Sequence, residues 1–278
     1  MKTGGLATLK GKGVLITGAG RGIGKRLALG FAHVGAHVGL LARSQAELEL
    51  AKLEIEHAGG SALRIRADVR NYQQMCAAME RMRSYFGRLD VLVCAAAVQG
   101  PIGPLAELKP KLWAETVETN LIGVMHSMRA ALPHMVEHRS GKIIVLTGGG
   151  SIRPRPFFSA FAASKTAVVR LVETVAEEVR AENVQVNAMA PGATYTHMTD
   201  QVIKAGERAG QKEIEAAERV RVSGGTSPEK QINLALFLAS ERSNHISGKI
   251  LHVHDDWKRL EKENMHPELY TLRRIHGR

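Results

Sequence analysis

A glycine-rich run carries the strongest chemical signal in this chain. The run TGAGRGIG occupies residues 17–24, directly after the apolar segment GVLIT (13–17) and at the start of a helical pattern. Glycines here allow a tight turn and a close approach to a pyrophosphate, and the helix N-terminus supplies N–H donors and positive potential. A strand, such a turn and a helix in this order indicate a dinucleotide site, although the spacing is T-G-x-x-x-G-x-G rather than G-x-G-x-x-G.

Two arginines indicate which nucleotide the site takes. An acidic residue at the end of the second strand would bind the ribose diol of NAD. Here that strand ends LLARS (40–44), so that Ala42 stands where an acid could sit and Arg43 follows, while Arg21 lies inside the glycine-rich run. Two guanidinium groups can hold a 2′-phosphate through charge-assisted bidentate contacts. We therefore expect NADP, with NAD as the less favoured cofactor.

Alternating strand and helix patterns must position these residues. The predicted strands are 13–17, 36–41, 61–67, 89–95, 141–147, 184–190 and 249–254. The predicted helices are 22–35, 44–58, 71–86, 111–137, 159–182 and 227–240. This alternation predicts right-handed crossovers and a doubly wound parallel sheet of the Rossmann type, an α/β fold covered by helices on both faces. We expect a single domain over residues 1–278.

Two segments are longer than the alternation of strands and helices requires. Residues 193–226 are too long for a simple connection between a strand and a helix, and we expect them to form a substrate loop or lid. The tail after His254, about residues 255–278, outlasts the last predicted strand. It is expected to pack over the site or on a neighbouring subunit, or else to remain a loosely held basic end.

Five motifs together resemble the short-chain dehydrogenase/reductase family in its shorter-subunit branch. They are TGAGRGIG (17–24), ADV (67–69), NLIG (120–123), FAASK (161–165) and NAMAPG (187–192). The likeness covers about residues 10–254. One departure is CAAA at 94–97, where the family has N-N-A-G.

The resemblance implies a cofactor site at the ends of several strands. Asp68 and Val69 would lie along the adenine ring. The implied set is Thr17, Gly18, Gly20, Arg21, Gly22, Ile23, Gly24, Arg43, Asp68, Val69, Ala95, Ala96, Lys165, Pro191, Gly192, Thr194 and Thr196.

The resemblance also implies hydride transfer between the nicotinamide and a carbonyl or secondary alcohol. In the family a tyrosine hydroxyl exchanges the substrate proton, and a nearby ammonium lowers the tyrosine pKa from about 10. Lys165 would supply that ammonium and bind the nicotinamide ribose, and Asn120 would kink its helix and hold a relay water. The family's serine falls at Gly148, so Thr147 is our first candidate for the orienting hydroxyl and Ser151 the second.

Phenylalanine occupies the position of the catalytic tyrosine. Phe161 cannot exchange a proton, and loss of a general acid–base group typically costs about 10²- to 10⁴-fold in rate. Three explanations are open: a designed replacement that traps a substrate complex, a natural one in which Tyr195 or His197 takes over, or a protein that binds the nucleotide without turnover. The intact Lys165 and Asn120 favour the first. We therefore expect an NADP-dependent enzyme for ketones and secondary alcohols, with reduced or absent activity, and a non-catalytic regulatory or scaffold protein that binds NADP(H) as the alternative.

Bulk composition excludes several other classes. The net charge of +11 is dispersed among acids, and 4% aromatic residues leave little for base stacking, so we expect no nucleic-acid partner. No apolar run is long enough to cross a membrane, and two cysteines suggest a reducing compartment, so we expect a cytoplasmic protein. We expect no metal site, on the premise that none of the twelve histidines forms an H-x-x-x-H pair on a helix.

The substrate and the assembly are less constrained. Arg153 and Arg155 in RPRPFF (153–158) favour a small polar or anionic substrate such as a sugar derivative. The long amphipathic patterns at 111–137 and 159–182 resemble the family's subunit-pairing helices, and this implies a homodimer or homotetramer.

Overall fold

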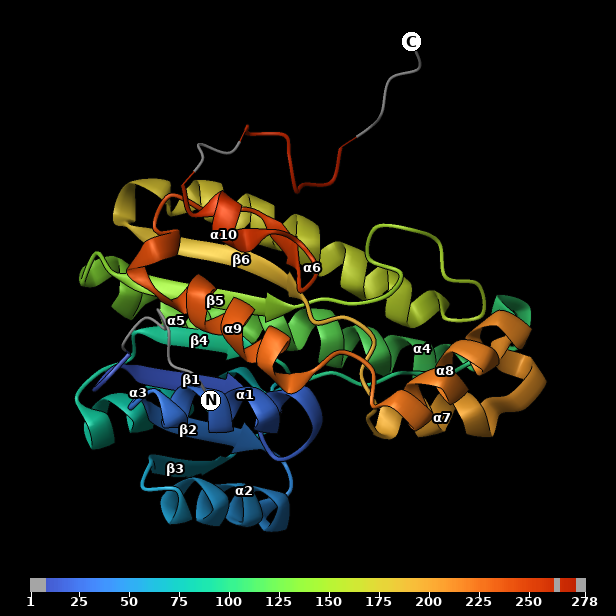
Figure 1. Cartoon of the computed structure of the whole chain (residues 1–278), viewed down its shortest axis with the longest axis horizontal. Coiled ribbons are helices and arrows are strands. Elements are labelled where there is room, and N and C mark those ends of the chain that lie inside the picture. Colours follow the sequence, from blue (N-terminus) through green and yellow to red (C-terminus); the bar gives the residue numbers. More distant parts are fainter. Residues whose placement is uncertain (1–8, 263–265, 274–278) are drawn as a thin grey trace.

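A seven-stranded parallel sheet forms the centre of the molecule (Figure 1). The structure is a computed structural model that describes residues 9–262 and 266–273. The strand order is β3-β2-β1-β4-β5-β6-β7. The strands are β1 (Gly13–Thr17), β2 (His37–Ala42), β3 (Ser61–Arg66), β4 (Val91–Cys94), β5 (Gly141–Leu146), β6 (Val184–Ala190) and β7 (Ile250–His252). The prediction of a doubly wound parallel sheet is confirmed, because the order reverses between β1 and β4.

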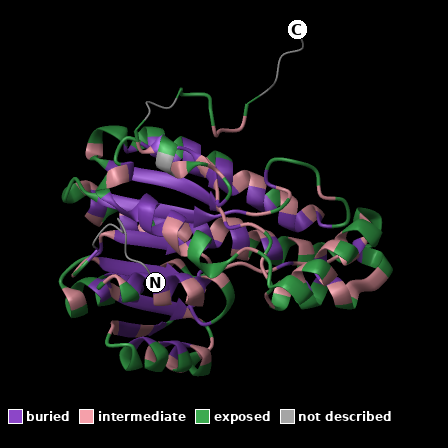
Figure 2. Ribbon diagram, in the orientation of Figure 1, coloured by how far each residue is buried: buried purple, intermediate pink, exposed green. Residues whose placement is uncertain are grey.

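Helices cover both faces of the sheet. They are α1 (Gly22–His33), α2 (Gln45–His57), α3 (Tyr72–Phe86), α4 (Pro110–Val117), α5 (Gly123–Glu137), α6 (Ser159–Glu178), α7 (His197–Ala205), α8 (Gln211–Ser223), α9 (Pro228–Ala239) and α10 (Trp257–Leu260). Alternate residues of β1 face opposite layers: Val14 and Ile16 pack with α1, α2 and α9, whereas Leu15 packs with α3, α5 and α6. The five inner strands are accordingly buried along most of their length, whereas the edge strands β3 and β7 are partly exposed (Figure 2).

The long helix expected over residues 111–137 is interrupted. The chain forms α4, then a π-helical turn at Glu118–Ile122, then α5. The apolar periodicity continues across the interruption, which is why the sequence pattern predicted one helix. The turn carries Asn120, and single π-helical turns inside helices are frequent at functional sites.

Residues 193–226, here called the insertion, fold into two helices beside the carboxyl ends of the strands. They form α7, a short 3₁₀ turn (Gly206–Ala209) and α8, which project beyond the sheet in orange (Figure 1). Their apolar side chains share a small cluster with the start of α6: Phe158, Phe161, Val202, Ala209 and Ala217. The ring at the catalytic position is therefore part of the contact between the insertion and the rest of the molecule.

Residues 266–273 of the tail lie along the last strand and α6. The Ile250 amide donates to the Tyr270 carbonyl (2.8 Å), and Lys249 Nζ donates to the carbonyls of His266, Pro267 and Leu269. Residues 263–265 and 274–278 of the predicted tail lie outside the described residues. Within the part of the chain that the structure describes, no helix is long and apolar enough to span a bilayer.

Candidate active site

A cleft of about 1870 Å³ opens at the carboxyl ends of the strands. Residues that follow β1, β2, β4, β5 and β6 line it: Gly18, Arg43, Ala95, Thr147 and Pro191, respectively. Parallel strands bring these positions to one edge, and the reversal of strand order between β1 and β4 leaves the crevice in which ligands of such folds bind.

The glycine-rich turn is shaped as a cradle. Gly18 has φ +68°, and a Cβ added there would lie 2.8 Å from the backbone of Ala96. A Cβ on Gly24 would lie 2.2 Å from the carbonyl oxygen of Gly18. Arg21 is the N-cap residue of α1, and its side chain does not accept a hydrogen bond from the helix backbone. The N–H groups in the first turn of α1 are therefore left for an external acceptor. These residues fit the pyrophosphate of a dinucleotide.

Thr17 joins the glycine-rich turn to the segment after β4. Its hydroxyl accepts from the amides of Ala95 (3.1 Å) and Ala96 (3.2 Å), which joins the end of β1 to the end of β4. Both hydrogen bonds use backbone amides, so alanine side chains at positions 95 and 96 do not prevent them, although the resembled family has N-N-A-G in place of CAAA.

The two arginines expected to bind the adenosine phosphate line the cleft and are exposed. Arg21 Nη1 lies 3.6 Å from Glu47 Oε1. Asp68 is held by Arg70 (Nη2 to Oδ2, 2.6 Å), whose hydrogen bond lowers the pKa of the Asp68 carboxyl, with a smaller contribution from Arg43. Sequence reasoning missed Glu47 and Arg70. The Asp68–Arg70 spacing of two residues was the only signal for this pair.

Asn120 is fully buried in the π-helical turn. Its side chain closes a pair of bonds with Val98, donating to the carbonyl (3.0 Å) and accepting from the amide (2.8 Å), and it also donates to Ser164 Oγ (3.1 Å). The π-helical turn thus fastens the segment after β4 to α6, beside the cleft.

Lys165 is buried one helical turn after Phe161. Its Nζ donates to the carbonyl of Leu146 (2.8 Å) and lies 5.8 Å from the centroid of the Phe161 ring. Burial lowers the pKa of Lys165 to about 8. The structure therefore places Lys165 near the Phe161 ring, and Asn120 is bonded to Ser164 of the same helix.

Neither hydroxyl position of the resembled family carries a hydroxyl here. Phe161 is 7% exposed and belongs to the apolar cluster under the insertion. A Cβ built on Gly148 would lie 3.7 Å from Phe161 Cε1, an ordinary contact distance. Position 148 thus points at the edge of the ring at 161, where a serine side chain would meet a tyrosine hydroxyl.

The two hydroxyl candidates near Gly148 differ in their surroundings. Thr147 Oγ1 donates to the carbonyl of Lys165 (3.5 Å) and is buried. Ser151 also lines the cleft and is 3% exposed, and its hydroxyl makes no hydrogen bond to any residue that the structure describes. Ser151 is therefore the hydroxyl that stays available to a ligand.

The segment after β6 closes the cleft on the side of the insertion. Gly192 has φ +72°, Thr194 Oγ1 accepts from Gln231 Nε2 (2.6 Å), and Thr196 caps α7. Gln231, which sequence reasoning missed, is buried in α9 and also donates to the carbonyl of Pro191 (2.8 Å). It fixes the turn that faces the glycine cradle.

The two substitutes considered for the missing tyrosine both line the cleft and are exposed. The Tyr195 hydroxyl donates to Asp200 Oδ1 (3.0 Å), and this hydrogen bond raises the pKa of Tyr195. His197 is the first residue of α7. A proton on Tyr195 is therefore held more tightly than on a free phenol, which does not favour proton transfer.

Comparisons with known proteins agree with this geometry. A family model described as short chain dehydrogenase matches residues 12–206. This chain belongs to the short-chain dehydrogenase family. The 3-oxoacyl-[acyl-carrier-protein] reductase FabG of Thermotoga maritima is 32% identical over 245 residues, which are 88% of this chain and 97% of that protein. The short chain dehydrogenase/reductase astE of Aspergillus oryzae is 32% identical over 248 residues, 88% of this chain and 94% of that protein.

Solved structures of short-chain dehydrogenases superpose closely. A gluconate 5-dehydrogenase from Burkholderia cenocepacia, in complex with NADP and tartrate, aligns with a TM-score of 0.78 at 28% identity, over 88% of this chain and 94% of that chain. Levodione reductase aligns with a TM-score of 0.80 at 27% identity, over 87% and 96%. The chain thus belongs to a family of oxidoreductases, and its relatives support an enzymatic role.

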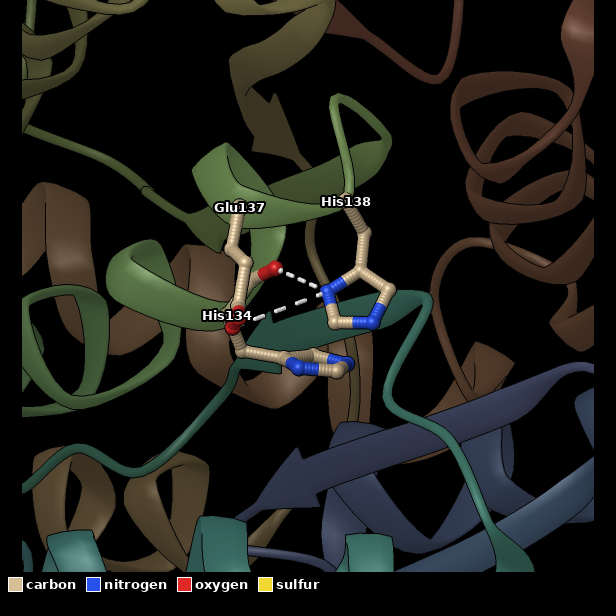
Figure 3. A group of neighbouring side chains, drawn as sticks. All are labelled: His134, Glu137 and His138. Carbon is tan, nitrogen blue, oxygen red and sulfur yellow. Dashed lines mark hydrogen bonds and ion pairs between the residues drawn. The ribbon is translucent and has the colours of Figure 1, made fainter.

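One expectation about histidines rested on a wrong premise. His134 and His138 do form an H-x-x-x-H pair, at the end of α5, and with Glu137 they make a group whose ligand atoms lie within 4.8 Å of one another (Figure 3). His138 Nδ1 bonds to the carbonyl of His134 (2.8 Å) and lies 4.0 Å from Glu137. None of the three lines the cleft, because α5 runs away from it toward the amino end of β5.

Proposed function

We propose that this chain is an NADP-dependent oxidoreductase that interconverts a ketone and a secondary alcohol of a small molecule. The observation that carries the proposal is that the glycine cradle of α1 and the buried Lys165 line one cleft. Asn120 lies beside that cleft and fixes the segment after β4. We further propose that it works as a cytoplasmic homo-oligomer, on a polar or anionic substrate such as a sugar derivative.

Preference for NADP is supported by charge at the adenosine end of the cleft. Arg21 and Arg43 both line it, and Asp68 is occupied by Arg70. A 2′-phosphate would find two guanidinium groups there, whereas no carboxylate directly follows β2 to bind the ribose diol of NAD. The NADP named in the gluconate 5-dehydrogenase complex agrees with this proposal.

Bound NADP(H) would supply the hydride, and the residues of the chain would hold the reacting groups. The Lys165 ammonium, held by the Leu146 carbonyl, lines the cleft and would there stabilise an alkoxide developing on the substrate. Ser151 offers a hydroxyl to the substrate oxygen. Phe161 has no proton to give, so the alkoxide formed on reduction would take its proton from the Lys165 ammonium or from solvent, and we expect turnover to be slow.

The same geometry bears on why the tyrosine is missing. A single designed replacement would account for Phe161 but not for Gly148, which lacks the second hydroxyl. The Phe161 ring is also well packed with Phe158 and Val202. We therefore propose that the site naturally lacks this pair of hydroxyls, and this keeps a protein that binds NADP(H) without turnover as the second candidate.

Restoring the hydroxyls tests both candidates. The proteins to compare are the wild type, Phe161→Tyr, the double variant Phe161→Tyr/Gly148→Ser, and Phe157→Tyr as a control that adds a hydroxyl on a half-exposed neighbouring ring. NADPH and NADH binding is measured by nicotinamide fluorescence, and turnover by absorbance over a panel of ketones, sugars and alcohols. We expect Phe161→Tyr to turn over at least about 10²-fold faster than the wild type and the control.

Each other result has a definite meaning. Equal rates for the wild type, Phe161→Tyr and the double variant would show that no hydroxyl is missing. Tight NADPH binding with no turnover in any variant would favour the non-catalytic candidate. Absence of NADPH binding would contradict the nucleotide site itself.

A further inference from the structure

Arg155 lies at the reacting end of the cleft, on the loop between β5 and α6. Its guanidinium carbon lies 3.9 Å from the centroid of the Phe158 ring and 5.7 Å from that of Phe161. Its stem passes Gly149 and Gly150, and the side chain is only 18% exposed. A positive charge is thus held against the ring at the catalytic position, on the side of the insertion.

Glu213 of α8 provides the counter-charge for Arg155, but only one of its carboxylate oxygens accepts hydrogen bonds from the guanidinium. Arg155 Nε (3.1 Å) and Nη2 (2.7 Å) both donate to the same oxygen, Oε2. Among the residues that the structure describes, Arg155 Nη1 and Glu213 Oε1 have no hydrogen-bond partner. An arginine fork that binds a carboxylate with two parallel bonds uses both oxygens, so this pairing falls short of the strongest arrangement.

The surroundings of the pair favour an anionic ligand. Arg153 lines the same cleft, is exposed, and forms no ion pair with any described residue. Lys165 adds a buried positive charge beyond the Phe161 ring. A substrate whose carbonyl lies near Lys165 would therefore meet a second, partly shielded cation a short distance away.

We propose that the substrate carries a carboxylate or phosphate group and that Arg155 binds this group in place of Glu213. The inference rests on the proposed function, since it concerns the substrate of that same site. Glu213 prevents Arg155 from remaining an unpaired, largely buried charge in the free protein, which would be costly. When the anion arrives, Arg155 keeps a partner and the Glu213 carboxylate, already 28% exposed, returns to water.

The same variants distinguish two roles of the Arg155–Glu213 pair: exchange of Glu213 for the substrate anion, and an ion pair that serves only structure. If Glu213 competes with the ligand, Glu213→Gln weakens the competitor and tightens anion binding, while Arg155→Met, which keeps the stem, abolishes it. If the pair only joins the loop to α8, both variants lower stability and neither changes the preference for anions.

The test uses the full chain loaded with NADPH. Calorimetry measures the binding of acetoacetate and levulinate against their methyl esters, and of dihydroxyacetone phosphate against dihydroxyacetone. The proteins are the wild type, Glu213→Gln, Arg155→Met, and Glu107→Gln as a control that removes a carboxylate from the exposed Arg208 ion pair. We expect Glu213→Gln to bind the anions about 5- to 10-fold more tightly, Arg155→Met to lose at least about 10-fold, and the esters, dihydroxyacetone and Glu107→Gln to show no change.

The two kinds of anionic ligand identify the charged group on the substrate. Tighter binding of acetoacetate and levulinate would indicate a carboxylate, and tighter binding of dihydroxyacetone phosphate would indicate a phosphate. Equal binding of charged and uncharged partners in every protein would overturn the inference, as would loss of stability in both variants with the anion preference unchanged. NADPH affinity is measured first and the anion titration is repeated without NADPH. Failure of the nucleotide site is thereby distinguished from failure of anion recognition.

Discussion

Lys165 shows at the residue scale how burial prepares a side chain for chemistry. The ammonium is enclosed, it is held by the Leu146 carbonyl, and its pKa falls to about 8. A lysine with such a pKa changes its charge near neutral pH. The same burial that makes it responsive must cost stability, because the charged form has left water.

This cost can be measured through its pH dependence. An unfolded lysine titrates near about 10.4. Between the folded and unfolded pKa values the unfolded chain binds a proton that the folded chain lacks, so the stability of the wild type rises with pH. Relative to Lys165→Met, the wild type should gain on the order of 2–3 kcal/mol between about pH 7 and about pH 10.

Denaturant unfolding of both proteins without cofactor, at several pH values, provides the measurement. Lys52→Met, at a surface ion pair with Glu56, is the control for which the difference from the wild type should stay constant. A difference between wild type and Lys165→Met that does not change with pH would contradict the burial argument.

At the element scale, the insertion depends on a small core of its own. Helices α7 and α8 bury few side chains, and the cluster that holds them includes Val202 together with Phe158 and Phe161. A region with so few apolar contacts opens more readily than the sheet. The packing of the insertion and the packing of the Phe161 ring thus depend on the same cluster.

Val202→Ala should therefore loosen the insertion without unfolding the sheet. Removing two buried methyl groups costs about 1–2 kcal/mol, and this raises the open fraction by about 5- to 30-fold. Trypsin cleavage within the insertion, after Lys204 or Arg208, should accelerate by a similar factor. The matched control is Val222→Ala on α8, where the valine is 87% exposed; equal cleavage of the two variants would count against the argument.

At the scale of the whole molecule, the tail connects the sheet edge to the cleft. Glu173 of α6 is 8% exposed, accepts from the Leu272 amide (2.6 Å), and pairs with Arg170 and Arg273. Tyr270 and Arg273 also line the cleft. The sequence left open whether this tail packs or stays loose, and the described residues pack on their own chain.

Glu173→Ala should release this end of the tail. The Leu272 amide loses its acceptor and Arg273 its counter-charge, so hydrogen exchange at residues 266–273 should speed up by about 10-fold, while exchange in β1 and β5 should not change. Glu177→Ala, one turn further along α6 at an exposed ion pair, is the control. Unaltered exchange in the tail of Glu173→Ala would show that other contacts hold it.

The sequence alone determined the class of the fold and the place of the nucleotide cradle. Both depend on local rules: apolar strands alternate with amphipathic helices, and a glycine-rich run directly follows the first strand and opens the first helix. The interruption at Asn120 was not readable from periodicity, because the apolar pattern runs through the π-helical turn. Only the family resemblance implied a kink at that residue.

Only the tertiary structure decided which side chains meet at the reacting end of the cleft. Gly148 and Phe161 are neighbours, Arg155 finds Glu213 across 58 residues, and Gln231 fastens the Pro191 turn across 40. The H-x-x-x-H pair was visible in the sequence and overlooked. Contacts between distant segments depend on how helices pack on the sheet, and no spacing within one segment encodes them.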